Sequence, residues 1–167
     1  MRRVGIVGHR ELSAEAAAFV GTMSSRLLSE AVKAPGDVVA ISALAEGADT
    51  LFAEAALSVH VPLEVVRPFS CYEDDFRNER SRRRYQHLAA AARKETKLRF
   101  IVRSSVAYEA AMRWVVENCD VLVAAWDGGP ARGRGGTAHA VRHATLIRRP
   151  VVHLDVARRV VTTRDRP

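Results

Sequence analysis

Short apolar runs alternate along this chain with longer stretches in which apolar residues recur at helical spacing. The apolar positions of residues 13–31 keep the 3.6-residue period of a helix, and they are Ala16, Val20, Met23, Leu27 and Ala31. Ser13 stands just before them, where a hydroxyl can accept a hydrogen bond from the first helical turn. Similar patterns predict helices over about 46–59, around 85–92, over 108–118 and over 137–147.

The apolar runs between these helices predict strands, several of them bounded by glycine or proline. They cover residues 3–7, 38–41, 63–66, 98–102, 121–125 and 151–154. Strands that alternate with helices are typical of βαβ units, so we expect an α/β, Rossmann-like, doubly wound fold with a mainly parallel sheet of about six strands and helices on both faces. We expect residues 1–155 to form one domain and residues 156–167 a short basic tail that frays.

The composition fits a single globular domain. The chain has 167 residues, 48% of them hydrophobic, and no apolar run approaches the roughly 20 residues that span a bilayer. The apolar run at residues 4–7 is too short for the core of a signal peptide, so a cytoplasmic protein without a membrane partner is expected. Cys71 and Cys119 stand far apart and form neither a disulfide framework nor a metal-ligand cluster. No metal and no cofactor is expected.

The positive charge is concentrated in one segment. The formal net charge is +7, and the stretch between Arg77 and Arg99 holds nine basic and two acidic residues, so this basic segment carries the whole excess. Such a segment can face an anionic partner. It can equally be the solvated face of an amphipathic helix, because Tyr85, Leu88 and Ala92 lie at helical spacing within it.

The strongest candidate chemistry lies where strands end. If the strands are parallel, the loops after the strands at 3–7, 38–41 and 121–125 open on the same edge of the sheet, where doubly wound proteins bind ligands. Glycines in these loops let backbone N–H groups approach an anion, and a following helix adds positive potential. The ligand-binding residues that we expect there are Gly8, His9, Arg10, Ser42, Glu46, Gly47, Asp49, Trp126, Asp127, Gly128, Gly135, Gly136 and Thr137.

The first loop offers a cation and an imidazole. Arg10 can form paired hydrogen bonds with a phosphate or carboxylate, and its alternative is a surface salt bridge with Glu11 or Glu15. His9 can stack on a base, donate a hydrogen bond or serve the structure alone.

The other loops leave similar choices. Glu46 and Asp49 stand near a helix start, where a carboxylate also favours the helix dipole. Thr137 can cap its helix, contact a phosphate or do both. Because phosphate contacts alone bind weakly against the cost of association, apolar or stacking contacts with a base are needed. The aromatic residues available are Trp126, Tyr72 and Phe69, the last of which is expected in the core.

Taken together, these motifs resemble the SLOG superfamily, named for the Smf/DprA and Lonely Guy proteins, and within it the small stand-alone bacterial members. The resemblance rests on residues 4–10 (VGIVGHR), residues 42–49 (SALAEGAD), residues 67–69 (RPF), residues 120–128 (DVLVAAWDG) and residues 135–137 (GGT). It implies a Rossmann-like fold that binds nucleotides or nucleotide-derived ligands, often as a homodimer.

The same resemblance bears on catalysis. Lonely Guy phosphoribohydrolases carry a catalytic glutamate three residues after the threonine of their glycine-rich motif, and this chain has Ala140 there. A methyl group neither attacks an anomeric carbon nor accepts a proton. A displaced carboxylate would have to come from elsewhere, for example Glu109 or Asp75. His139 and His143 lie one turn apart, without a third metal ligand in the sequence pattern.

We therefore predict non-catalytic binding or sensing of a nucleotide-like small molecule. The alternative is a nucleoside-monophosphate phosphoribohydrolase or nucleoside hydrolase that uses a displaced carboxylate. A second alternative is nucleic-acid binding through the basic segment, whose affinity should fall steeply with salt. Between Arg77 and Arg99 the one aromatic residue is Tyr85. This scarcity of aromatic side chains argues against stacking on single-stranded bases.

Overall fold

The computed structural model describes residues 1–34, 36–130 and 136–164. These residues build one seven-stranded sheet in the order β4-β3-β2-β1-β5-β6-β7. Neighbouring strands are parallel except β6 and β7, which are antiparallel. The strands are β1 (Arg2–Gly8), β2 (Val38–Ser42), β3 (Leu63–Arg67), β4 (Lys94–Lys97), β5 (Val121–Trp126), β6 (Val151–Asp155) and β7 (Val160–Arg164). The mainly parallel sheet predicted from the sequence is confirmed.

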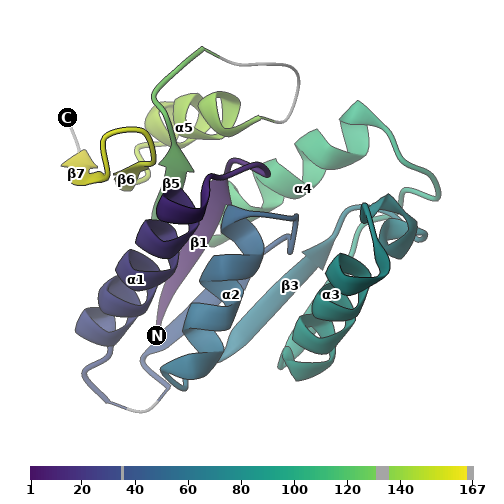
Figure 1. The fold of residues 1–167 in the computed structure, drawn as a ribbon, viewed down its shortest axis with the longest axis horizontal. Helices are drawn as coiled ribbons and strands as arrows, with labels where there is room; N and C mark the ends of the chain where they lie inside the picture. The colour runs from purple at the N-terminus through teal and green to yellow at the C-terminus, as the bar shows by residue number, and fades with distance from the viewer. Residues whose placement is uncertain (35, 131–135, 165–167) are drawn as a thin grey trace.

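Helices cover both faces of this sheet. On one face lie α1 (Ala14–Ala31), α2 (Ala48–Ser58) and α3 (Glu79–Ala91), with a short 3-10 helix, η1 (Tyr72–Asp75), before α3 (Figure 1). The opposite face is covered by α4 (Ser105–Asn118) and α5 (Thr137–Leu146). Each face therefore has its own hydrophobic core, as a doubly wound fold requires.

The central strand shows how the alternating side chains of a strand feed two cores. Val4 and Ile6 of β1 belong to the core beneath α1 and α2, whereas Val7 belongs to the core beneath α4 and α5. Gly5 lies on the α4 side, where a Cβ atom would come within 2.9 Å of a methyl group of Val115. The missing side chain thus lets α4 approach the sheet closely.

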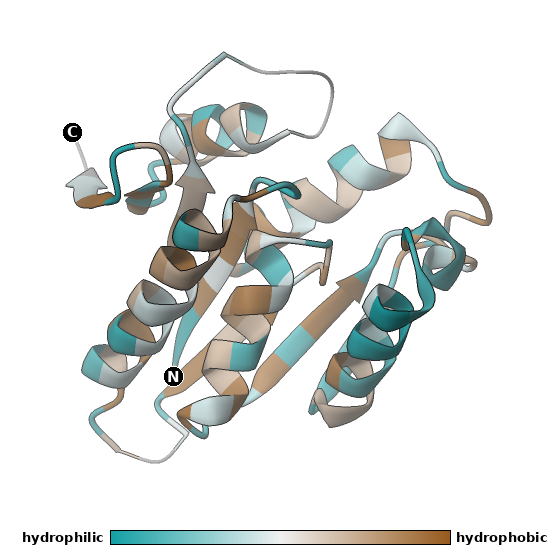
Figure 2. Cartoon of the chain, in the orientation of Figure 1, coloured by the Kyte–Doolittle hydropathy of each residue, from teal (hydrophilic) through white to brown (hydrophobic). Residues whose placement is uncertain are grey.

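The hydropathy of the elements follows this layering. Figure 2 shows the central strands as largely hydrophobic and α3 as strongly hydrophilic, with Tyr85 and Leu88 as its buried contacts. The serine cap predicted for α1 is present, because Ser13 Oγ accepts a hydrogen bond from the Ala16 amide at 3.2 Å. In the part of the chain that the structure describes, no helix is long and apolar enough to cross a membrane.

The fourth strand lies earlier than the sequence predicts. The apolar run at residues 98–102 predicted a strand, but β4 is Lys94–Lys97, and Ile101 and Val102 beyond it are 74% and 67% exposed. β4 pairs with β3 on one side only and forms the sheet edge. Edge strands commonly carry charged residues, which the search for buried apolar runs does not detect.

Part of the predicted tail forms a strand. Residues 156–167 were expected to fray, yet Val160–Arg164 forms β7 and pairs along the whole of β6, with Val161 opposite Leu154. Asp155 shapes the connecting turn, because its Oδ1 accepts hydrogen bonds from the amides of Ala157 (3.0 Å) and Arg158 (2.9 Å).

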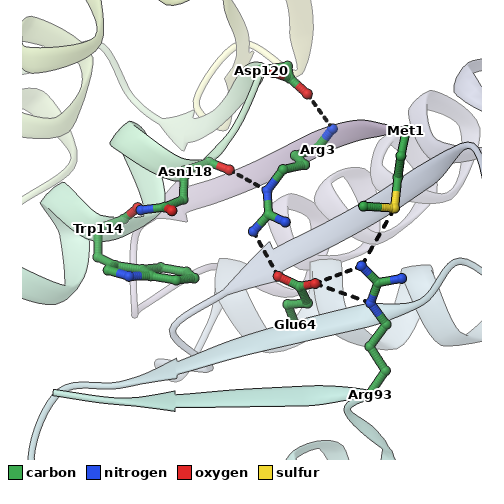
Figure 3. Close-up of polar contacts among 7 residues, drawn as sticks. All are labelled: Met1, Arg3, Glu64, Arg93, Trp114, Asn118 and Asp120. Atoms are coloured by element: carbon green, nitrogen blue, oxygen red, sulfur yellow. Dashed lines mark hydrogen bonds and ion pairs between the residues drawn. The ribbon is translucent and has the colours of Figure 1, made fainter.

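A buried carboxylate joins strands at the amino ends of the sheet (Figure 3). Glu64 of β3 accepts hydrogen bonds at 2.7 Å from Nη2 of Arg3, in β1, and from Nη2 of Arg93, just before β4. Burial by itself raises the pKa of Glu64, but the hydrogen bonds and charges of the two arginines lower it below its usual value. This ion network reaches across β2, which lies between β1 and β3. It lies near the amino ends of the strands, away from the loops at their carboxyl ends.

Candidate functional site

The loops after β1, β2 and β5 meet at the carboxyl ends of the strands, and His9 joins them. The His9 amide donates to the Ala125 carbonyl of β5 at 2.9 Å, and its carbonyl accepts from the Ala48 amide of α2 at 3.1 Å. Its ring atom Nε2 accepts from the Asp127 amide at 3.4 Å and lies 3.2 Å from Asp127 Oδ1. The predicted convergence of the three loops is therefore present.

Two glycines are required by this convergence. A Cβ atom on Gly8 would lie 2.4 Å from Cβ of Ala48 and 2.8 Å from the Ala125 carbonyl oxygen. Gly47 has a φ of +86°, and a Cβ atom there would lie 2.4 Å from the carbonyl oxygens of His9 and Arg10. These glycines were expected to let the backbone approach a ligand; in the structure their missing side chains also let the loops contact one another.

A cleft of about 370 Å³ opens between these loops, one side of α4 and the first turn of α5. It lies at β1 and β5, where the strand order reverses direction, and doubly wound folds bind ligands at such points. Seven of the thirteen residues predicted from the sequence lie in its wall: Gly8, His9, Arg10, Asp49, Trp126, Gly136 and Thr137.

The other predicted residues lie elsewhere. Ser42 is fully buried beneath the loops, where its hydroxyl donates to the Asp49 carbonyl at 3.1 Å and accepts from the Leu44 amide at 2.9 Å. Glu46 and Gly47 line a neighbouring cavity. Asp127 and Gly128 are not part of the wall of the cleft. Gly135 falls outside the described residues.

Arg10 is held at the cleft by residues from distant segments. Its Nη1 lies 3.3 Å from Oδ2 of Asp75, at the end of η1, and its guanidinium lies 4.8 Å from the ring centroid of Tyr108, in α4. The Tyr108 hydroxyl donates to the same carboxylate, and Nε of Arg103 lies 3.1 Å from its other oxygen. The carboxylate that pairs with Arg10 is thus Asp75, and not Glu11 or Glu15 as the alternative expected.

Asp49 is the one acidic side chain in the described wall of the cleft. It is the second residue of α2, with 6% exposure. Burial raises its pKa to about 7, although the charge of Arg10 and hydrogen bonds with the backbone of Ala45 and Ala43 act in the opposite direction. Its carboxyl group therefore changes charge near neutral pH, which the helix-start position alone did not predict.

The aromatic residues divide between cleft and core. Tyr72, Tyr108 and Trp126 contribute to the cleft wall. The Trp126 indole is fixed by a 2.9 Å hydrogen bond to the Gly129 carbonyl. Phe69 is buried in the core, as expected, and contacts Tyr72 edge-on with centroids 5.3 Å apart. Tyr108 was missed by the sequence analysis because nothing nearby in sequence marks it as a partner of Arg10.

The amino end of α5 completes the cleft. Gly136 occupies the capping position without a side-chain cap, so Thr137 is the first residue of the helix. Both line the cleft, and the helix dipole places positive potential there. Ala140, at the position of the glutamate in the enzymes discussed above, is fully buried against the core of α4 and α5.

Several arginines of the basic segment are paired with carboxylates of the chain itself. Arg82 and Arg83 of α3 pair with Glu79, and Arg84 pairs with Glu54 of α2. Arg93 instead pairs with Glu64, at the ion network of Figure 3. These arginines thus lie in two places, on α3 and beside Glu64 near the amino ends of the strands.

Comparison of the fold with solved structures defines its class. The chain shares its fold with DNA processing protein A from Streptococcus pneumoniae, at a TM-score of 0.67 and 20% identity over 92% of this chain and 50% of that one. The same protein from Helicobacter pylori, described with a single-stranded DNA binding mode, gives 0.65 and 20% over 91% and 64%. This chain therefore spans between half and two thirds of the length of these proteins.

A second group of similar structures binds a cofactor. The molybdenum cofactor binding protein from Rippkaea orientalis gives a TM-score of 0.59 and 14% identity over 91% of this chain and 75% of that one. Comparison with protein-family models gives no match, and comparison with curated protein sequences gives none either. These structural likenesses confirm the fold expected from the sequence, a Rossmann-like α/β fold with a mainly parallel sheet.

Proposed function

We propose that the chain binds a nucleotide or nucleotide-derived small molecule in the cleft at the carboxyl edge of the sheet, and that it does not convert this molecule. The observation that carries the proposal is the meeting of Arg10, the amino end of α5 and three aromatic side chains around a cleft of about 370 Å³. That volume is within the range of roughly 300–1,000 Å³ found for small-molecule sites.

The wall of the cleft offers contacts for both parts of a nucleotide. Arg10 and the α5 amino end, at Gly136 and Thr137, favour a phosphate group. Ala111, Met112 and Val115 of α4 supply an apolar wall on which a base can pack, beside Tyr108. Ala140 argues against the phosphoribohydrolase reaction, because a glutamate there would have to enter the core.

Thermal unfolding and calorimetry with AMP, ADP, ATP, NAD, ADP-ribose and cyclic dinucleotides test this proposal. We expect at least one of them to raise the Tm and to bind with one-to-one stoichiometry, and chromatography of the mixture to detect no free base. An unchanged Tm across the whole set would contradict binding. Mass spectrometry of molecules released by heating the purified protein identifies a ligand that is already bound.

Asp49 keeps the hydrolase alternative open. It is a carboxyl group inside the cleft with a pKa of about 7, which suits a general acid or base. Release of base from AMP that is abolished in Asp49→Asn but retained in Asp75→Asn would favour this alternative over simple binding.

Nucleic-acid binding is the other alternative, and the fold shared with a single-stranded DNA binding protein supports it. The test is titration with a labelled single-stranded oligonucleotide at low and physiological salt. Affinity that falls steeply with salt and is lost in Arg80→Ala, Arg82→Ala, Arg83→Ala combined would favour it. We expect weak binding instead, because Tyr85, the one aromatic residue of the basic segment, is buried and is not available to stack on bases.

A further inference from the structure

A second cavity, of about 260 Å³, adjoins the cleft. It lies between the start of α2, at Gly47 and Thr50, and the segment that leads into α3. Arg10 lines both the cleft and this second cavity. Because the two cavities share Arg10, a molecule bound in the cleft can extend past this side chain into the second cavity.

The described wall of the second cavity is strongly basic. Three arginines, Arg10, Arg77 and Arg84, contribute to it, against one carboxylate, Glu46. Guanidinium groups bind phosphate oxygens through paired, charge-assisted hydrogen bonds. Three of them around one small cavity thus favour a phosphate group over a neutral or cationic one.

Most of the carboxylate partners of these arginines are not part of the cavity wall. Arg77 is hydrogen-bonded to Glu11, and its Nε lies 3.6 Å from Glu46 Oε2, with 60% of the side chain exposed. Arg84 pairs with Glu54, which lies outside the wall. Ion pairs this exposed contribute little to stability, so a doubly charged phosphate can compete with the carboxylates.

We propose that this cavity is a second phosphate-binding subsite, and that the ligand of the chain is a nucleotide-derived molecule with at least two phosphate groups. One phosphate lies in the cleft at Arg10 and the amino end of α5. The other lies between Arg77 and Arg84. The identity of the ligand rests on the proposed function, whereas the anion site at Arg77 and Arg84 rests on the second cavity alone.

Glu46 gives the subsite a distinguishing property. Its side chain is 19% exposed and is the acidic member of the wall. It competes with a phosphate for Arg77, so Glu46→Gln strengthens phosphate binding at this subsite. A residue that merely supported the fold would show no such gain.

Titration with inorganic pyrophosphate, followed through the NMR signals of the arginine Nε–H groups, tests the subsite without a nucleotide. We expect the signals of Arg77 and Arg84 to shift, with binding about ten-fold weaker in Arg84→Ala. Arg83→Ala is the matched control, because Arg83 lies on the same helix and is also ion-paired, yet is outside the cavity wall. Unshifted signals of Arg77 and Arg84 would overturn the subsite.

Calorimetry with AMP, ADP and the linear dinucleotide pApA then tests the two-phosphate ligand. Whichever of ADP and pApA binds more tightly should lose about ten-fold in affinity in Arg84→Ala. The affinity for AMP should change less than about two-fold. Equal loss for AMP and the two-phosphate ligands, or no loss for any, would overturn the proposal. If pyrophosphate binds but no nucleotide does, the proposed function fails while the anion subsite stands; if AMP alone binds, the reverse holds.

Discussion

Arg10 Nη1 and Asp75 Oδ2 lie 3.3 Å apart, although 65 residues separate them in the sequence. The contact brings η1 to the loop after β1, and the ring of Tyr108 supports the guanidinium from α4. A cation held from two sides in this way can present its remaining N–H groups to a ligand with little loss of side-chain entropy.

The first prediction concerns this cation. Arg10→Gln should weaken nucleotide binding by about ten-fold or more, because it removes a charge-assisted contact worth roughly 1.5–3 kcal/mol. Tyr108→Phe is the control, since it keeps the ring beside Arg10 and removes only the hydroxyl that contacts Asp75; its affinity should change by less than about three-fold. Calorimetry measures both variants. Equal affinities for wild type and Arg10→Gln would contradict a role for Arg10 in binding.

The second prediction concerns Asp49 and pH. Its pKa is raised from 3.8 to about 7 in the folded protein, so between these values the unfolded chain loses this proton while the folded chain keeps it. The contribution of Asp49 to the free energy of unfolding therefore falls as pH rises from about 4 to 7, by at most roughly 1.4 kcal/mol per pH unit. Above about pH 7 it stays constant.

Asp49→Asn cannot titrate and should escape this loss. We expect the difference in Tm between Asp49→Asn and wild type to increase in favour of the variant from pH 4.5 to pH 8. Thermal unfolding at several pH values measures it, and Asp74→Asn, at an exposed position of η1, is the control. A difference in Tm that stays constant over this range would show that Asp49 titrates normally.

The third prediction tests the space beside Gly5. Gly5→Ala places a methyl group 2.9 Å from Val115 Cγ1 and 3.1 Å from Cys119 Sγ, and should lower the free energy of unfolding by about 1–3 kcal/mol. Gly21→Ala, in α1 with no atom within 4 Å of the new Cβ, should instead raise it by roughly 0.5–1 kcal/mol. Denaturant unfolding measures both changes. If Gly5→Ala raised the free energy of unfolding as Gly21→Ala does, close packing beside Gly5 would not limit the space there.

The fourth prediction concerns the ion network of Figure 3. Glu64→Gln should lower the free energy of unfolding at pH 7 by about 1–2 kcal/mol, because Arg3 and Arg93 lose a buried partner but remain partly exposed to water. The pKa of Glu64 is lower in the folded state than its ordinary 4.5. Its stabilisation is present above that value and is lost as pH falls through the folded pKa.

The gap between wild type and Glu64→Gln should therefore narrow as the pH is lowered below about 4. Guanidinium chloride would screen the network, so urea unfolding at pH 7 and pH 3 is the appropriate measurement. A gap that persists unchanged at pH 3 would indicate that shape, and not charge, makes Glu64 important.

The sequence predicted the fold well where hydrophobic pattern decides the structure. The apolar period of residues 13–31 gave α1, and the runs ending at Gly8 and Trp126 gave the two central strands. β4 was missed because an edge strand needs no apolar residues, and the apolar Ile101 and Val102 drew the prediction to an exposed loop.

The candidate site was predictable in outline but not in its contacts. The position of a loop after a strand is encoded locally, so Arg10 and Thr137 could be placed at the cleft from the sequence. The pairing of Arg10 with Asp75, and the burial that raises the pKa of Asp49, depend on segments brought together only by the complete fold. The second cavity also escaped prediction, because Arg77 and Arg84 come from a segment whose pattern indicates only an amphipathic helix.

The central position of β1 has a consequence for how a ligand acts on the whole molecule. β1 pairs on one side with β2 and on the other with β5, and the Arg3 amide bonds to Asp120 across 117 residues of sequence. The cleft follows this seam, with Asp49 and Tyr72 from one half of the sheet and Gly136 from the other. A molecule seated there contacts both halves, so its binding should raise the free energy of unfolding of the sheet as a whole.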